Sequence, residues 1–182
     1  MATLSSVGAL TRPAGATTVV PMDWPTLSRQ ASLIVRAKVR ETEVFRYPNE
    51  DRLWTRIHLE DVEILHARAP LAWTPETLRS FSIVQVGGSR DGITDRVPGT
   101  IAYRAGDEVL LFLEASPEDW VTVGIGLGTF FVERPPTCPP DRLDCARLAP
   151  ANPSTFVSDV EFQARSAARS AADWIRDIAA YQ

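Results

Sequence analysis

Apolar and polar residues alternate between residues 33 and 45, which predicts a long strand with one wet face. The apolar positions are Leu33, Val35, Ala37 and Val39. Side chains two residues apart lie on the same face of a strand, so these four define the face that we expect to be buried. Residues 47–51 are typical of a turn, and they end this predicted strand.

The alternation resumes in a second strand, which is predicted to run from about Leu53 to Leu65. One face carries Leu53, Thr55, Ile57 and Leu59, and the other carries Trp54, Arg56, His58 and Glu60. After Asp61 the apolar phase slips by one residue, to Val62 and Ile64. Such a slip is typical of a β-bulge, which bends a strand as small barrels require.

Shorter apolar segments predict the rest of the sheet. Residues 78–86 are expected to form a third strand after a loop at 70–76, and residues 90–99 a short hairpin. The continuous apolar run Val109–Leu113 is typical of a strand that is buried on both faces. Further strands are predicted at 120–123 and 129–132.

The two last strands are joined by a segment with glycine at every second position, Gly124, Gly126 and Gly128. Such a segment permits a sharp bend or the close approach of another backbone, and we favour the bend. A phosphate-binding loop is not expected, because a strand pattern follows the glycines where an anion site needs the start of a helix.

Helix signals occur near both ends of the chain. Asp23 as N-cap and Pro25 in the first turn predict a short helix that ends at about Gln30. Residues 158–161 match a capping box and predict an amphipathic C-terminal helix over 158–182. Its apolar stripe includes Trp174 and Ile178, which we expect to pack against the sheet.

These elements predict a mainly β domain, an OB-like Greek-key β-barrel with a short N-terminal helix and a C-terminal amphipathic helix. The length of 182 residues suits one domain. The expected organisation is an extended leader over 1–22, a barrel over 23–134, a Pro-rich loop over 135–157 and the helix over 158–182.

The two cysteines, Cys138 and Cys145, are predicted to form a disulfide, because they lie seven residues apart in the Pro-rich loop. Disulfides persist in oxidising compartments, so an extracytoplasmic protein, periplasmic or secreted, is expected. The first 15 residues lack the basic and apolar regions of a signal peptide, so any export signal is expected to lie outside the printed sequence. The alternative is a pair of free thiols in a cytoplasmic protein.

Several blocks between residues 30 and 132 also resemble a known group of proteins. They are 32–39, 55–59 with 64–65, 87–88, 97–99, Tyr103, 106–113 and 123–130. In order and spacing these blocks resemble uncharacterised exported bacterial proteins similar to the netrin-like or TIMP-like module. The resemblance implies an exported protein with an OB fold.

The chain departs from that group at two places. It has Leu65-His66-Ala67 where the group often has Leu-Lys-Gly, so the turn there is expected to differ. Metalloprotease inhibitors of the TIMP class chelate the protease zinc through an N-terminal cysteine, and no cysteine precedes Cys138 here. The resemblance therefore does not imply inhibition by that route.

No cofactor, metal site or catalytic residue is predicted. The complete set of His and Cys ligands is His58, His66, Cys138 and Cys145. Eight residues of extended strand would separate the histidines by roughly 26 Å, which is too far for two ligands of one ion. Neither a nucleophile elbow nor a His-Glu-x-x-His motif occurs. A hydrolase with a site assembled around His58 or His66 is kept as an alternative, because triads form from residues distant in sequence.

Charge and hydropathy exclude two classes of partner. The chain has 19 basic and 23 acidic residues, a net charge of −4, whereas a nucleic-acid surface needs clustered cations. No apolar run approaches the ~20 residues of a membrane span. Nucleic acid is therefore not an expected partner, and no transmembrane helix is expected.

A protein-binding surface is predicted at one rim of the barrel. It combines Trp54, Arg56 and His58 with the segment that contains Gly87, Gly88, Arg90 and Arg96. OB-type barrels use a strand face and adjoining loops for ligands, and Trp and Arg are frequent anchors of protein interfaces. The other interpretation is that Trp54 only covers the barrel edge.

The function expected from these features is that of a non-catalytic, extracytoplasmic protein-binding module with an unidentified partner. The alternatives are the hydrolase described above and a structural component of a cell-surface or extracellular assembly.

Overall fold

The computed structural model describes residues 22–68, 74–152 and 169–181. The expected leader, apart from Met22, and the capping box at 158–161 lie outside these ranges. The elements in chain order are α1 (Trp24–Gln30), β1 (Leu33–Phe45), β2 (Trp54–Ala67), α2 (Pro75–Arg79), β3 (Ser82–Val86), β4 (Gly88–Arg90), β5 (Ile93–Asp95), β6 (Glu108–Ala115), β7 (Trp120–Thr122), β8 (Thr129–Glu133), β9 (Arg147–Pro150), α4 (Ala171–Ile178) and the 3-10 helix η2 (Ala179–Tyr181).

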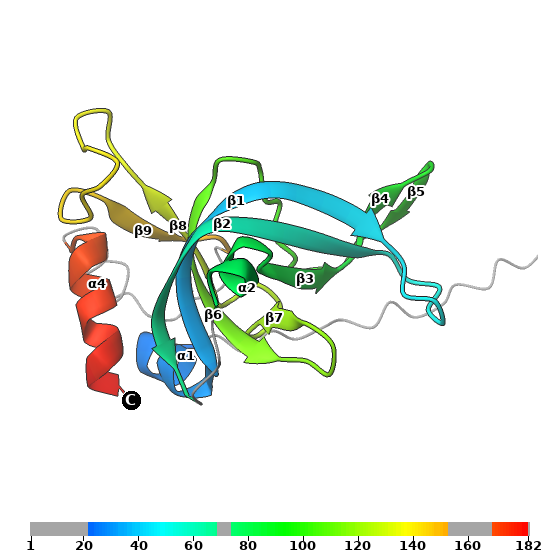
Figure 1. Ribbon diagram of the computed structural model, residues 1–182, viewed down its shortest axis with the longest axis horizontal. Helices are drawn as coiled ribbons and strands as arrows, with labels where there is room; N and C mark the ends of the chain where they lie inside the picture. Colours follow the sequence, from blue (N-terminus) through cyan, green and yellow to red (C-terminus); the bar gives the residue numbers. More distant parts are fainter. Residues whose placement is uncertain (1–21, 69–73, 153–168, 182) are drawn as a thin grey trace, which may run out of the picture.

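A strongly curled antiparallel sheet dominates the molecule, in the strand order β3-β2-β1-β6-β8-β9 (Figure 1). β7 pairs with β6 beyond the end of β8, and β4 and β5 form a separate hairpin. β3 also contacts β7, but within the described residues no ladder joins them. The fold is therefore mainly β with a short C-terminal helix, and the sheet does not close into a barrel.

The long strands β1 and β2 form an arched ribbon with several irregularities in register. One of them involves Asp61, which has a φ of 51°, in the left-handed region. The partners of Arg36 and Lys38 are Glu63 and Glu60, so β2 has two residues where β1 has one, which is one extra residue. The predicted bulge after Asp61 is confirmed, and it bends the ribbon.

The sheet separates two hydrophobic cores, and β6 contributes to both. Leu110 and Phe112 point into the core under α1 and α4, whereas Val109, Leu111 and Leu113 point into the hollow of the curled sheet. All five side chains are fully buried. The prediction of a strand buried on both faces is thus confirmed.

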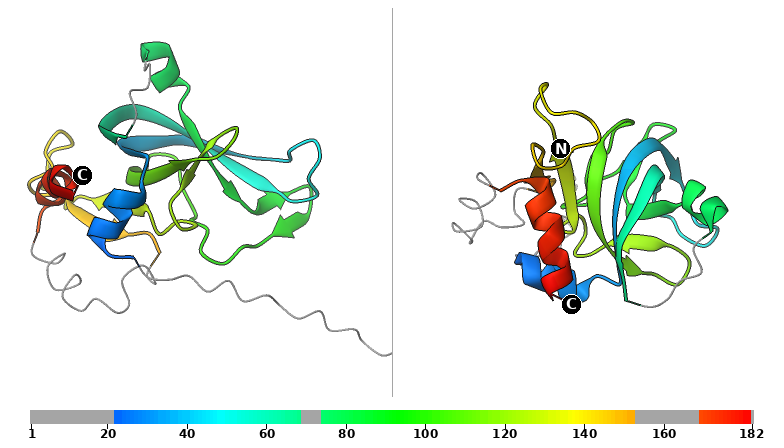
Figure 2. Two further views of the ribbon diagram at one scale, coloured as in Figure 1. Left: turned by 90° about the horizontal axis from the view of Figure 1, so that it is seen from below. Right: turned by 60° about the vertical axis from the view of Figure 1, so that its left-hand side comes forward.

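The two helices α1 and α4 lie on the same face of the sheet (Figure 2). The ring of Trp24 in α1 lies 4.9 Å from that of Trp174 in α4 and 5.0 Å from that of Phe112. Asp23 caps α1 as predicted, because its carboxylate accepts a hydrogen bond of 2.8 Å from the Thr26 N–H. No helix in the described ranges has the length and apolar character needed to cross a membrane.

The C-terminal helix differs from its prediction. Instead of one helix through 158–182, residues 169 and 170 are not helical, and α4 begins at Ala171. Ser170 and Asp173 form a capping box there, each side chain accepting a hydrogen bond from the backbone N–H of the other residue. A cap within the apolar stripe favours a new helix start over continuation, so the prediction of an unbroken helix is wrong.

Three further predictions need correction. Residues 75–79 form α2, with Thr74 as N-cap and Pro75 in the first turn. The predicted strand start at residue 78 is therefore wrong, and so is the predicted loop at residues 75 and 76, whereas residues 70–73 lie outside the described ranges. The expected Pro-rich loop contains β9, which pairs with the edge of β8. β9 is a four-residue strand, and its partner decides its conformation more than its own sequence does.

The predicted disulfide joins Cys138 to Cys145, with 5.6 Å between their Cα atoms. Beyond this loop, the N–H groups of Ala171 and Ala172 donate to the carbonyls of Ala146 and Leu143. The first turn of α4 is therefore held by Leu143 within the disulfide loop and by Ala146 directly after it.

The glycine-rich segment 124–128 makes both the bend and a close backbone approach. Gly124 and Gly126 have φ values of 64° and 88°. A Cβ atom on Gly126 would lie 2.5 Å from the Gly99 carbonyl oxygen, and one on Gly128 would lie 2.6 Å from that of Phe112. The predicted bend is present, and the close approach of another backbone, which was the alternative, is present as well.

Replacement of Trp174 by alanine is expected to lower the free energy of unfolding by about 3–5 kcal/mol, because it opens a cavity against Trp24. Arg176→Ala on the same helix should change it by less than about 0.5 kcal/mol, since that side chain is 74% exposed. Guanidinium unfolding of both variants measures the difference. Equal losses would contradict the packing described for α4.

Candidate functional site

Three aromatic side chains gather where β1 ends and β2 begins. The ring centroids of Phe45 and Tyr47 lie 5.0 Å apart, and those of Tyr47 and Trp54 lie 5.4 Å apart, at interplanar angles of 72° and 78°. The guanidinium carbon of Arg56 lies 4.6 Å from the centroid of Phe45. We call Phe45, Tyr47, Trp54 and Arg56 the aromatic rim.

The local sequence explains why these side chains meet. Phe45 pairs with Trp54 and Glu43 pairs with Arg56 across the ladder. These two pairs lie two residues apart along each strand, so their side chains are on one face of the ribbon. The inward face of the same ribbon carries Thr55, which is buried. The sequence predicted Trp54 and Arg56 as residues of a binding surface. Phe45 was predicted only as part of a strand, and Tyr47 only as part of a turn.

A carboxylate from a distant loop holds the rim in place. Tyr47 donates its hydroxyl hydrogen bond to Asp119, and an Arg56 amino group lies 3.4 Å from the same carboxylate. The Asp119 side chain is only 14% exposed. Burial and the nearby negative charge of Asp119 raise the pKa of Tyr47 to about 12, so the hydroxyl stays a donor at neutral pH.

Trp54 lines two pockets. The larger has a volume of about 480 Å³, and the smaller, between β3 and β7, about 230 Å³. The larger pocket is lined by Tyr47, Pro48, Asn49, Glu50, Trp54, Val84, Ser116, Pro117 and Glu118. The Trp54 indole N–H donates a hydrogen bond of 2.6 Å to Glu50, which fixes one carboxylate at this pocket.

The other half of the predicted surface lies on the opposite face of the ribbon. Gly87, Gly88 and Arg96 line a groove of about 610 Å³ together with Val44 and Thr55. Adjacent strand residues point to opposite faces, so this groove does not share a wall with Phe45 or Arg56. The structure therefore brings Trp54 and Arg56 together but separates them from the glycines.

Arg90 and His58 take positions of their own. Arg90 donates a hydrogen bond of 3.1 Å to the Val44 carbonyl, which seats the β4–β5 hairpin against the end of β1. The His58 imidazole lies 3.7 Å from the Glu43 carboxylate, next to Arg56 along β2. His58 therefore lies beside the aromatic rim, and its described contact is with Glu43 and not with a ring of the rim.

The two histidines lie eight residues apart on β2. His66 pairs with Ile34 near the end of β2 that is remote from the rim, and burial together with Arg68 lowers the pKa of its imidazole. Cys138 and Cys145 are bonded to each other, so neither is a thiolate ligand. Among the described residues, no three His, Cys, Asp or Glu side chains are grouped to hold a metal ion.

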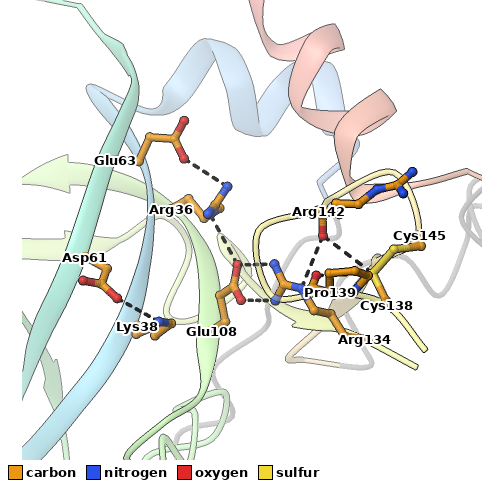
Figure 3. A network of polar contacts seen from close by, with 10 residues as sticks. All are labelled: Arg36, Lys38, Asp61, Glu63, Glu108, Arg134, Cys138, Pro139, Arg142 and Cys145. Atoms are coloured by element: carbon orange, nitrogen blue, oxygen red, sulfur yellow. Dashed lines mark hydrogen bonds and ion pairs between the residues drawn. A yellow bond between two sulfur atoms is a disulfide. The ribbon is translucent and has the colours of Figure 1, made fainter. Parts of the chain in front are cut away.

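A second charged cluster has a structural explanation (Figure 3). Glu108 on β6 accepts two hydrogen bonds from Arg134, one of them 2.9 Å long, and pairs with Arg36 at 3.3 Å. Arg36 also pairs with Glu63 at 3.1 Å, and Arg134 donates to the Arg142 carbonyl in the disulfide loop. This network ties β1, β2 and β6 to the chain after β8.

Comparison with known proteins gives no match: no family model, no curated protein and no solved structure is significantly similar to the chain. The resemblance to the netrin-like or TIMP-like module therefore stays a prediction, and the candidate site rests on its own geometry.

Arg56→Ala is expected to lower the free energy of unfolding by about 2 kcal/mol, because it leaves the largely buried Asp119 carboxylate with one partner fewer. Arg52→Ala is the matched control, since that side chain is 58% exposed and its pair with Asp95 spans 3.5 Å. Urea unfolding measures both. A loss no larger than that of Arg52→Ala would show that Arg56 does not anchor the rim.

Stability is expected to fall as the pH rises from 10 towards 12, partly because of Tyr47. The unfolded chain releases this proton near 10.0 and the folded protein near about 12, so ionisation first stabilises the unfolded state. The contribution of Tyr47 to the free energy of unfolding is fully present below pH 10 and is lost progressively as the pH rises to about 12. In Tyr47→Phe the decline should be shallower, and unfolding midpoints over this range will show whether the two slopes differ.

Proposed function

We propose that this chain is a non-catalytic protein-binding module that acts outside the cytoplasm, and that it binds its partner through the aromatic rim and the 480 Å³ pocket beside it. The observation that carries the proposal is a preassembled anchor. Phe45, Tyr47 and Trp54 are already packed against one another, and Asp119 holds Tyr47 and Arg56. Few rotamers remain to be fixed on binding, which lowers the entropic cost of association.

The residue types support protein recognition. Tyr, Trp and Arg are the side chains most enriched among those that dominate binding energy at protein interfaces. A pocket next to such anchors provides space for a side chain of the partner. The interpretation that Trp54 only covers an edge does not account for the two pockets beside it.

We interpret the curled sheet as an OB-like barrel that is left open between β3 and β7. In barrels of this type, ligands lie on a strand face and its adjoining loops. The aromatic rim is made in the same way, from the β1–β2 ribbon and the loop that carries Asp119. The exported location is proposed from the Cys138–Cys145 disulfide, since such bonds persist in oxidising compartments.

The alternatives receive less support. A hydrolase built on His58 would need a nucleophile beside the imidazole, and the group that the structure places there is the exposed carboxylate of Glu43. A structural role in a surface assembly predicts contacts over much of the surface, whereas binding through the rim predicts contacts at one place.

Position-specific crosslinking tests the proposal. A photoreactive benzoylphenylalanine placed at Asn49, in the wall of the pocket, should crosslink a discrete protein from a native extracytoplasmic extract. The same group at Glu76 on α2 should give no such adduct. Excess unlabelled protein should abolish the adduct, and excess Trp54→Ala, checked for folding by circular dichroism, should not.

The outcomes separate the three functions. Equal adducts from both positions would favour a structural assembly, and the absence of a competed adduct at Asn49 would overturn the proposal. His58→Ala and His66→Ala should leave the adduct unchanged, whereas a hydrolase that holds its substrate through either histidine would lose it.

A further inference from the structure

The pocket beside the aromatic rim combines flat rings, prolines and negative charge. Tyr47 and Trp54 meet almost at right angles, so two aromatic walls bound the same space. Pro48 and Pro117 stand in the two loops at the pocket, where their fixed φ angles limit loop motion. The volume of about 480 Å³ exceeds what a single amino-acid side chain needs.

The charge of this pocket is negative only. Its lining contains Glu50 and Glu118 and no Lys or Arg. Arg56, the basic residue of the rim, is already held by Asp119 and by the ring of Phe45. Both Glu50 and Glu118 are exposed, so both carboxylates are within reach of a ligand.

The negative charge near the pocket affects the pKa of Tyr47. Besides burial and Asp119, the charge of Glu118 contributes to the raised pKa of the phenol. The Glu118 carboxylate therefore acts on the same space that the Tyr47 ring lines. A cation in the pocket would be attracted by Glu50 and Glu118, the two carboxylates of its lining.

We propose that the pocket between Tyr47, Trp54, Glu50 and Glu118 receives the basic side chain, arginine or lysine, of the partner protein. This inference rests on the proposed function and names the chemistry of the partner. Aromatic faces attract cations through the ring quadrupole, and the two carboxylates add Coulomb attraction. An acidic side chain would be repelled, and an apolar one would leave both charges without compensation.

The overall charge of the chain agrees with a basic partner. With a net charge of −4, the protein attracts a positively charged surface over distances of about 10 Å at moderate salt. The pocket then fixes one cation of that surface. Electrostatic complementarity of this kind increases the association rate and excludes acidic competitors.

Blocked peptides test the inference directly. The probes are Gly-Gly-Arg-Gly-Gly and Gly-Gly-Lys-Gly-Gly, each compared with a neutral isostere that carries citrulline or norleucine. The readout is the indole N–H resonance of Trp54, assigned with Trp54→Phe, because this group donates to Glu50 at the pocket. Both basic peptides should shift it in a saturable way, and the neutral peptides should bind about fivefold more weakly or less.

Variants locate the charge effect. Glu50→Gln with Glu118→Gln should weaken binding of the arginine peptide about tenfold while keeping an acceptor for the Trp54 indole. Glu76→Gln on α2 removes the same kind of charge elsewhere and should leave the affinity unchanged. Higher salt should weaken the wild-type interaction.

The inference and the proposed function fail in different ways. Equal affinity for the arginine and citrulline peptides, or an unchanged affinity in the double glutamine variant, would overturn the inference. If the Asn49 adduct forms equally well in that double variant, the module binds a protein but not through a basic side chain. If the peptides bind as expected while no adduct forms, the pocket recognises cations and the protein-binding function falls.

Discussion

The packing of this domain depends on β6, a strand whose side chains enter two different cores. Leu110 and Phe112 meet the helices, and Val109, Leu111 and Leu113 fill the hollow of the sheet. Hydrogen-bonded neighbours flank it on both edges, with β1 on one side and β7 and β8 on the other. Because apolar burial is the main driving force of folding, this strand couples the helical layer to the curled ribbon.

The aromatic rim stands outside both cores and depends on a different interaction. Asp119 connects the β1–β2 turn to the loop between β6 and β7, although Tyr47 lies 72 residues away in sequence. One partly buried carboxylate thus fixes the relative positions of two loops. This link positions the side chains of the rim, whereas the two hydrophobic cores contain most of the buried apolar side chains.

Sequence periodicity was sufficient for the elements whose pattern is long or unambiguous. β1, β2 and β6 were predicted because alternation or continuous burial leaves one strand interpretation, and α1 because Asp23 and Pro25 mark its start. β9 and the break at Ser170 were not predicted, since tertiary pairing and a competing cap decide them. α2 was missed although Thr74 and Pro75 carry the same signal as α1.

The candidate site was half predictable for a related reason. Trp54 and Arg56 follow from the wet face of β2, but Asp119 shares no local pattern with them and reaches the rim only through the fold. The prediction that Gly87 and Trp54 share one surface is wrong, because the Gly87 carbonyl accepts a hydrogen bond from Thr55, which faces inward. Only the pleat of the ribbon decides which neighbours share a face.

The glycine-rich segment has a consequence for how this chain can vary over evolutionary time. At Gly126 and Gly128 a methyl group would collide with backbone oxygens, which cannot rotate away as the end of a side chain can. Substitution at either position would require the backbone around Gly99 or Phe112 to move. Descendants of this sequence can therefore exchange exposed surface residues long before they can exchange these two glycines.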